Sequence, residues 1–240
     1  MDTAQQKQHI TVNEKPLETK PETQRENIYL LPGLLADGRI FKNFAKGEGN
    51  YIDVIYPEPH RKETLAHFAK RLAEQITEPN PVLVGTSFGG VLAIEIAKVI
   101  NVKQVILLGS VKHKDELAWY KNLIHILRLH KRVSPRTIRL GGFASRLFAP
   151  KETREWQTFF NMVYSTDGDY IHWVIDRVLA WKNTEYPENI LHLHGTKDPL
   201  FPTRYITEPV VYIQGAGHSM VMDHAEELRT AIKEHTGIVI

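Results

Sequence analysis

The sequence predicts an α/β fold, in which a mostly parallel, open sheet carries helices on both of its faces. Short apolar runs rich in β-branched residues alternate along the chain with longer segments whose apolar residues recur at helical spacing. Strands separated in this way by helices pair in parallel through right-handed crossovers. Ligands bind such sheets at the carboxyl ends of the strands, so functional residues are expected in the loops that follow the strands.

The predicted elements begin at residue 27. Strands are expected at 28–31, 51–56, 82–84, 104–108, 190–195 and 210–213. Helices are expected at about 40–46, 65–76 and 220–235, and another starts near residue 88 with Leu92, Ile96 and Val99 on one face. Pro57 and Pro59 are expected to halt the second strand, because proline cannot donate to a ladder.

Between residues 111 and 182 the alternation stops and the apolar spacing becomes helical. Apolar faces are expected within 117–127, 156–163 and 170–181. A helical block inserted between two strands of an open sheet is expected to lie over their carboxyl ends as a cap; the alternative is that these helices extend the core. Residues 1–26 are polar and are predicted to be a solvated tail, with a single domain at 27–240.

Composition excludes several classes of function. The 240 residues include 30 lysines and arginines against 28 aspartates and glutamates, so net charge gives no reason to expect a nucleic-acid partner. The absence of cysteine excludes disulfides, thiolate metal sites and thiol catalysis. No apolar run is long enough to span a membrane, and no signal peptide is apparent, so a cytoplasmic location is expected. No metal or organic cofactor is expected either.

The segment Gly85-Thr86-Ser87-Phe88-Gly89 has the pattern Gly-x-Ser-x-Gly between a buried strand and a helix. Two glycines let strand and helix pack closely, which leaves Ser87 at the tip of a sharp turn with its hydroxyl clear of the sheet. The sequence therefore predicts a nucleophilic serine at position 87.

A serine nucleophile needs a general base, and that base needs an orienting carboxylate. His218 is the predicted base, because it follows the last strand in a turn of small residues. Asp198 follows the preceding strand and is the predicted acid, with Asp115 and Asp223 as rivals. His192 and His194 lie inside a strand and are expected to be structural.

An acyl-transfer reaction also develops an oxyanion, which two backbone amides can bind. One is expected from Phe88, the residue after the nucleophile. The other is expected from Leu34, in the loop after the first strand. Only main-chain groups are needed at these two positions.

Four segments together resemble the α/β-hydrolase fold superfamily, of the small capped kind found among bacterial esterases and lipase-like hydrolases. They are Pro32-Gly33-Leu34-Leu35, Gly85-Thr86-Ser87-Phe88-Gly89-Gly90, His194-Gly195-Thr196-Lys197-Asp198-Pro199 and Gly215-Ala216-Gly217-His218. The resemblance covers residues 28–240. Many members begin with two extra antiparallel strands, which the short tail here can hardly supply, and many have His-Gly where this chain has Pro32-Gly33. A serine nucleophile argues against the dehalogenase and epoxide-hydrolase branches, whose nucleophile is an aspartate.

These features predict a serine hydrolase that cleaves a small-molecule carboxylic ester or thioester through an acyl-enzyme on Ser87. Two alternatives stay open. The same triad can transfer the acyl group to an acceptor other than water, and a receptor can keep the fold and bind a ligand with little turnover.

A basic group of residues accompanies the predicted cap and suggests contact with anionic groups, either on the substrate or on a lipid surface. The alternative is an ordinary solvated helix face. The group consists of Lys112, Lys114, Lys121, Arg128, Lys131, Arg132, Arg136, Arg139 and Arg146.

Overall fold

The computed structural model describes residues 25–117, 124, 134, 136–137 and 154–240. These residues form a sheet of six strands, all parallel, in the order β2-β1-β3-β4-β5-β6. The strands are β1 Asn27–Leu31, β2 Asn50–Asp53, β3 Val82–Thr86, β4 Gln104–Leu108, β5 Ile190–Gly195 and β6 Val211–Ile213. The predicted α/β class and parallel pairing are confirmed.

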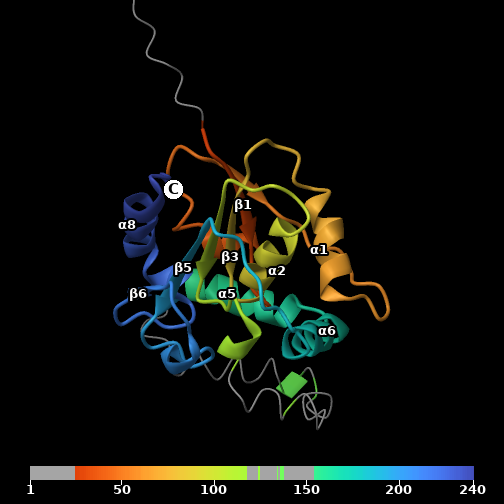
Figure 1. The fold of residues 1–240 in the computed structure, drawn as a ribbon. Coiled ribbons are helices and arrows are strands. Elements are labelled where there is room, and N and C mark those ends of the chain that lie inside the picture. Colours follow the sequence, from red (N-terminus) through yellow and green to blue (C-terminus); the bar gives the residue numbers. More distant parts are fainter. Residues whose placement is uncertain (1–24, 118–123, 125–133, 135, 138–153) are drawn as a thin grey trace, which may run out of the picture.

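Helices cover both faces of this sheet (Figure 1). They are α1 Leu65–Ala73, α2 Phe88–Ala97, α5 Arg154–Ser165, α6 Gly168–Leu179, α7 Met220–Asp223 and α8 Ala225–Thr236, with 3-10 turns η1 Gly38–Phe41, η2 Lys114–Glu116 and η5 Thr203–Tyr205. Alternate residues of each central strand enter two separate cores. In β1, Tyr29 and Leu31 pack with α1 and α2, whereas Ile28 and Leu30 pack with η1 and α8. Burial on both faces explains why the strand sequences are continuously apolar.

The largest differences from the predicted element bounds lie in three places. The helix expected at 40–46 is the short turn η1, in which the Asp37 carboxylate accepts from the Arg39 amide. The second strand ends at Asp53, short of Tyr56. The closing helix is interrupted at His224, whose φ of −126° and ψ of 34° are not helical, so α7 and α8 are separate.

Helix α2 is more deeply enclosed than its sequence indicated. Every residue from Phe88 to Ile96 is buried, including Glu95, because α1, α6 and the sheet surround the helix. Val99, expected on its apolar face, lies beyond the end of the helix and is 46% exposed. A helix buried on all sides has no polar stripe, so the prediction that only one face of this helix is buried was wrong.

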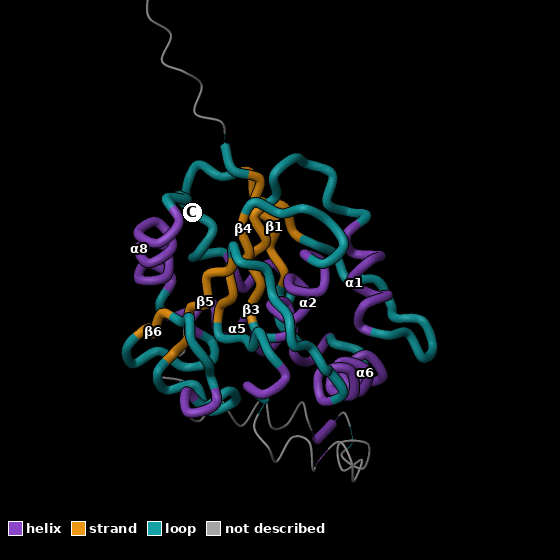
Figure 2. Tube along the Cα trace, in the orientation of Figure 1, coloured by secondary structure: helices purple, strands orange, loops and turns teal. Residues whose placement is uncertain are grey.

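Helices α5 and α6 lie at one end of the sheet, below it in the view of Figures 1 and 2. Their contacts place them at the carboxyl ends of the strands. The Asp37 amide, in the loop after β1, donates a 3.2 Å hydrogen bond to the Met162 sulfur of α5. The Trp173 ring of α6 lies 6.4 Å from the ring of Phe88, which follows β3. Of the helix predicted within 117–127 the structure describes only Leu117 and Ile124, and of the tail predicted at 1–26 only Arg25 and Glu26.

No helix among the described residues has both the length and the apolar character needed to cross a membrane.

Candidate active site

The turn between β3 and α2 holds Ser87 in a backbone conformation that serine rarely adopts, with φ 50° and ψ −118°. Its flanking glycines cannot be replaced without a clash. A Cβ on Gly85 would lie 2.4 Å from the Gly89 carbonyl oxygen, and one on Gly89 would lie 2.0 Å from that of Leu31. Close packing of strand, helix and neighbouring loop therefore imposes the turn, as the Gly-x-Ser-x-Gly pattern predicted.

The structure brings Ser87, His218 and Asp198 together from three different loops. The Ser87 Oγ lies 3.0 Å from His218 Nε2, and His218 Nδ1 lies 2.8 Å from Asp198 Oδ2. An ionised carboxylate only accepts hydrogen bonds, so Nδ1 carries the proton and Nε2 presents its lone pair to the serine hydroxyl. This is the tautomer that a general base requires.

Asp198 is itself held in place by its own loop. Its Oδ1 accepts from the amides of Leu200 at 2.8 Å and Phe201 at 2.9 Å, while the Phe201 ring packs on His218. Burial alone would raise the pKa of Asp198, but its hydrogen bond and charge interaction with His218, together with the Phe201 amide, outweigh burial and lower it. Asp198 therefore stays ionised beside the imidazole.

The rival acids lie elsewhere. The Asp115 side chain is 69% exposed and pairs with His113 at 3.2 Å. Asp223 ends the short helix α7, where burial raises its pKa, the opposite of what an orienting carboxylate needs. Of the three candidates, Asp198 is the one that contacts His218.

Two other histidines lie near the triad, at the end of β5. Both are buried, as predicted for structural residues. The Nε2 of His194 lies 2.8 Å from the Phe201 carbonyl and 3.7 Å from Asp198 Oδ2. Burial lowers the pKa of His194, although its bond to Phe201 and the charge of Asp198 oppose the shift. Burial likewise lowers the pKa of His192 to about 3.

Those lowered values predict a simple pH profile. Because burial lowers the pKa of His192 to about 3, this histidine should not gain a proton in the range where activity is measured, and the lowered pKa of His194 acts in the same direction. A plot of log kcat/KM against pH should fall with a slope of one on its acid side. A slope of two would show that two groups near the site titrate in this range.

The loop after β1 lies against the nucleophile. A Cβ on Gly33 would be 3.1 Å from the Ser87 Cβ, so the main chain of this loop runs directly beside the serine. Within the described part of the chain, the amides of Leu34 and Phe88 donate to no other residue. Both amides are therefore without a partner among the described residues, which an oxyanion site requires, and their role in binding a substrate oxygen stays a prediction.

The comparisons with known proteins agree with this geometry at the level of family. Residues 29–231 match the model of the alpha/beta hydrolase family. The chain belongs to the alpha/beta hydrolase family. No curated protein sequence matches it.

Solved structures share the fold of this family member. A hydrolase from Pseudomonas aeruginosa PA01 is similar with a TM-score of 0.69 and 12% identity, covering 88% of this chain and 90% of that chain. A thermophilic esterase from Thermogutta terrifontis has a TM-score of 0.59 and 20% identity over 87% and 88% of the two chains. An esterase from Exiguobacterium antarcticum has a TM-score of 0.58 and 20% identity, covering 88% of this chain and 91% of that chain. Identities this low show the fold alone.

A crevice of about 1030 Å³ opens beside the loop after β1 of this hydrolase-family chain. Pro32, Tyr56, Tyr170 and Trp173 contribute aromatic and apolar surface, and its outer part carries charged residues of both signs. The Tyr170 hydroxyl is buried and has no hydrogen-bond partner among the described residues. None of Ser87, Asp198 and His218 lines this crevice, so it adjoins the loop after β1 and not the triad itself.

Sequence reasoning missed Tyr56. Its hydroxyl donates to the Pro32 carbonyl at 2.9 Å, and its ring packs edge-on against Phe88. Tyr56 thereby supports both segments that carry the two free amides. A tyrosine between a strand and two prolines gives no such signal in the sequence.

Tyr56→Phe should therefore lower kcat more than it raises KM. Removing the hydroxyl leaves the Pro32 carbonyl without this donor and loosens the loop that carries the Leu34 amide, so we expect kcat to fall by roughly tenfold, since a hydrogen bond contributes about 1 kcal/mol. Steady-state kinetics on a chromogenic ester measures the change. Tyr164→Phe, at a 57% exposed tyrosine, is the matched control; equal effects in both variants would contradict this role.

Among the described residues, no group of three or more histidines, cysteines, aspartates or glutamates is arranged to hold a metal ion.

Proposed function

We propose that this protein is a serine hydrolase that cleaves a carboxylic ester or thioester through an acyl-enzyme on Ser87. The observation that carries the proposal is the continuous hydrogen-bonded path from Asp198 through His218 to the Ser87 hydroxyl. Membership of the alpha/beta hydrolase family and the esterases among the structural neighbours support it.

In the first half of the reaction the Ser87 oxygen attacks the carbonyl carbon of the substrate while His218 Nε2 takes the hydroxyl proton. The negative charge that develops on the carbonyl oxygen is bound by the amides of Leu34 and Phe88. Asp198 stabilises the imidazolium that forms. The tetrahedral adduct then collapses, the bond to the leaving alcohol or thiol breaks, and His218 returns the proton to the leaving group.

In the second half His218 takes a proton from water, and the resulting hydroxide attacks the acyl-enzyme. Collapse of the second adduct releases the carboxylic acid, and the proton held by His218 returns to Ser87. Each residue of the triad ends in the state in which it began. The reaction consumes one water and needs no redox partner.

Turnover of ester and thioester panels, combined with covalent labelling of Ser87, tests this function. Hydrolysis with rapid labelling supports it. Labelling with transfer of the acyl group to an added alcohol or amine, in preference to water, identifies an acyltransferase instead. Labelling without turnover identifies a receptor that keeps the triad.

The suggested attraction of anionic groups by the basic residues of the cap stays a separate prediction, because most of these residues lie outside the described part of the chain. The prediction is wrong for Lys112, because this lysine is fully buried and cannot contact an anionic surface.

A further inference from the structure

Lys112 lies in the loop after β4 and is 0% exposed. Burying an ammonium group is costly unless its protons have partners. The Nζ of Lys112 donates to Glu116 Oε1 at 2.9 Å, to the Thr207 carbonyl oxygen, and to His192 Nδ1 at 3.3 Å. All three protons are accounted for. A surface role for Lys112 is excluded, and the question is what such an enclosed charge does.

Contacts at both ring nitrogens fix the protonation state of His192. Its Nε2 lies 3.1 Å from the Ser110 carbonyl oxygen, which only accepts, so Nε2 must carry the proton. Nδ1 is then a lone pair and accepts from Lys112. Burial lowers the pKa of His192 strongly, and the Lys112 charge adds to this effect while the Glu116 charge opposes it. His192 is therefore neutral, with the Ser110 carbonyl accepting at Nε2 and Lys112 donating at Nδ1.

From His192 the contacts lead to the nucleophile. The Ser110 Oγ donates to the Ser87 carbonyl oxygen at 2.7 Å, and the Ser87 amide donates to the Leu108 carbonyl at 3.2 Å. Ser110 is packed tightly against the same turn, because a Cβ on Gly90 would lie 2.4 Å from its Oγ. The strained main chain of Ser87 is thus held by Ser110, whose own carbonyl is held by His192.

Glu116, the ion-pair partner of Lys112, contacts Thr207, which follows Asp198 in the chain. Glu116 Oε1 accepts from the Thr207 amide at 3.0 Å and from the Thr207 hydroxyl at 2.7 Å. Thr207 ends the segment that begins at Asp198 and includes Phe201. One buried ion pair therefore joins the loop that precedes the cap to the loop that carries the predicted acid.

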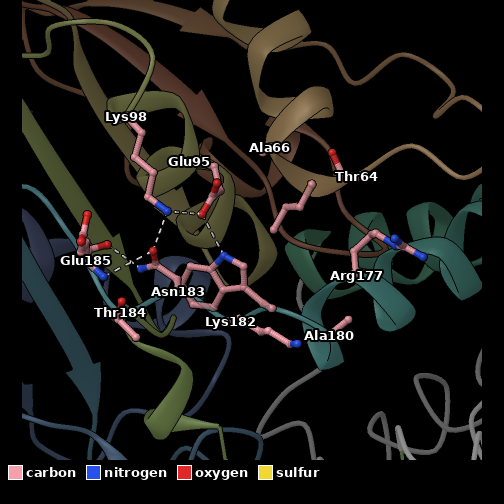
Figure 3. Close-up of a pocket in the computed structure, with 12 residues that line it drawn as sticks. Thr64, Ala66, Glu95, Lys98, Arg177, Ala180, Lys182, Asn183, Thr184 and Glu185 are labelled. Carbon is pink, nitrogen blue, oxygen red and sulfur yellow. Dashed lines mark hydrogen bonds and ion pairs between the residues drawn. The ribbon is translucent and has the colours of Figure 1, made fainter.

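The main chain of Lys112 is anchored as well, by Asn183, which is one of the residues that line the pocket drawn in Figure 3. Asn183 Nδ2 donates to the Lys112 carbonyl oxygen at 2.9 Å, and Asn183 Oδ1 accepts from Lys98 Nζ at 2.5 Å. Lys98 in turn pairs with Glu95 at 2.6 Å, and Glu95 also accepts from Trp181 Nε1. These contacts tie Lys112 to the far end of α2, the helix that Ser87 begins.

We infer that Lys112 is a positioning residue for Ser87, acting through His192 and Ser110 to hold the nucleophile at its hydrogen bond with His218. The inference rests on the proposed function. Its alternative is that the Lys112–Glu116 pair only stabilises the fold, in which case its loss lowers the melting temperature but leaves the reactivity of the folded serine unchanged.

The reactivity of Ser87 can be measured directly with a fluorophosphonate probe. The Ser87 oxygen attacks phosphorus, fluoride leaves, and the hydroxyl proton passes to His218. Lys112→Met keeps an unbranched side chain, one heavy atom shorter, and removes its donors. We expect the labelling rate of the folded variant to fall about 10- to 100-fold, because a displacement of about 1 Å of a reacting group has effects of this size. Lys114→Met, at an exposed lysine two residues later, should label at the wild-type rate.

Two further variants separate positioning from stability. Lys112→Met/Glu116→Gln removes the unpaired charge that the single variant leaves, so it should regain melting temperature while labelling stays slow. Ser110→Ala keeps the ion pair and removes only the bond to the Ser87 carbonyl, so it should slow labelling with little change in melting temperature. These two variants decide the question if Lys112→Met does not fold.

Nitrogen-detected NMR of the imidazoles adds a readout that a purely structural role would not move. Wild-type His192 should show the neutral Nε2–H tautomer at neutral pH. In folded Lys112→Met the Nε2 resonance of His218 should move, because its hydrogen bond with Ser87 is displaced. Labelling of Lys112→Met and Ser110→Ala at the wild-type rate would overturn the inference while leaving the proposed function intact. Failure of the wild type to label at all would overturn both.

Discussion

Ser87→Ala should abolish ester hydrolysis, with kcat reduced by about 10⁴- to 10⁶-fold, the loss typical of a triad residue that acts as part of a unit. The reason is chemical: alanine has no oxygen to form the acyl-enzyme, and the amides of Leu34 and Phe88 can then only assist attack by water. Steady-state turnover of a chromogenic ester measures the loss.

The fold should survive this change, because the side chain of Ser87 contacts His218 and not the core. Thermal unfolding of Ser87→Ala checks this directly. Ser165→Ala, on the surface of α5, is the matched control and should retain full activity. More than a tenth of wild-type activity in Ser87→Ala would show that another residue is the nucleophile.

Asp198→Asn should lower kcat by roughly 10⁴-fold, as expected when the base is held in the wrong tautomer. The backbone determines the orientation of the new amide. Because the amides of Leu200 and Phe201 donate to Oδ1, the asparagine oxygen must take that position and its NH₂ must face His218. His218 Nδ1 then has to accept, so Nε2 carries the proton and cannot take another from Ser87.

Asp115→Asn provides the comparison, since Asp115 follows β4 and was the main rival from the sequence. Its side chain is exposed and pairs with His113, so we expect activity within twofold of wild type. A deep loss in Asp115→Asn together with an active Asp198→Asn would reverse the assignment of the acid.

The sequence was sufficient to predict the parts of this molecule in which local pattern and tertiary packing agree. Strands β4 and β5 have the predicted bounds, because continuous apolar runs are buried on both faces of a parallel sheet. The turn at Ser87 was predictable because two glycines at fixed spacing are required by the contact between strand and helix. Asp198 and His218 could be chosen because each lies in the loop that follows a recognisable strand.

Other features depend on contacts between distant segments, and local pattern does not report them. Lys112 was grouped with surface cations, since a lysine beside other charged residues usually faces solvent, yet it is enclosed by Glu116, His192 and Thr207. The one available signal was the spacing of Lys112 and Glu116, four residues apart directly after a buried strand. Tyr56 offered no comparable signal, because its partner Pro32 lies in another loop.

The central claim is that Ser87 forms a covalent acyl intermediate, and intact-protein mass spectrometry during turnover of an activated ester tests it most directly. Rapid acid quenching should trap a species heavier than the free protein by the mass of the acyl group, and peptide mapping should place that group on Ser87. Asp198→Asn should accumulate the same species more slowly, and Ser87→Ala should form none. Product release without any acylated protein, or acylation of Ser87→Ala at the wild-type rate, would contradict the mechanism.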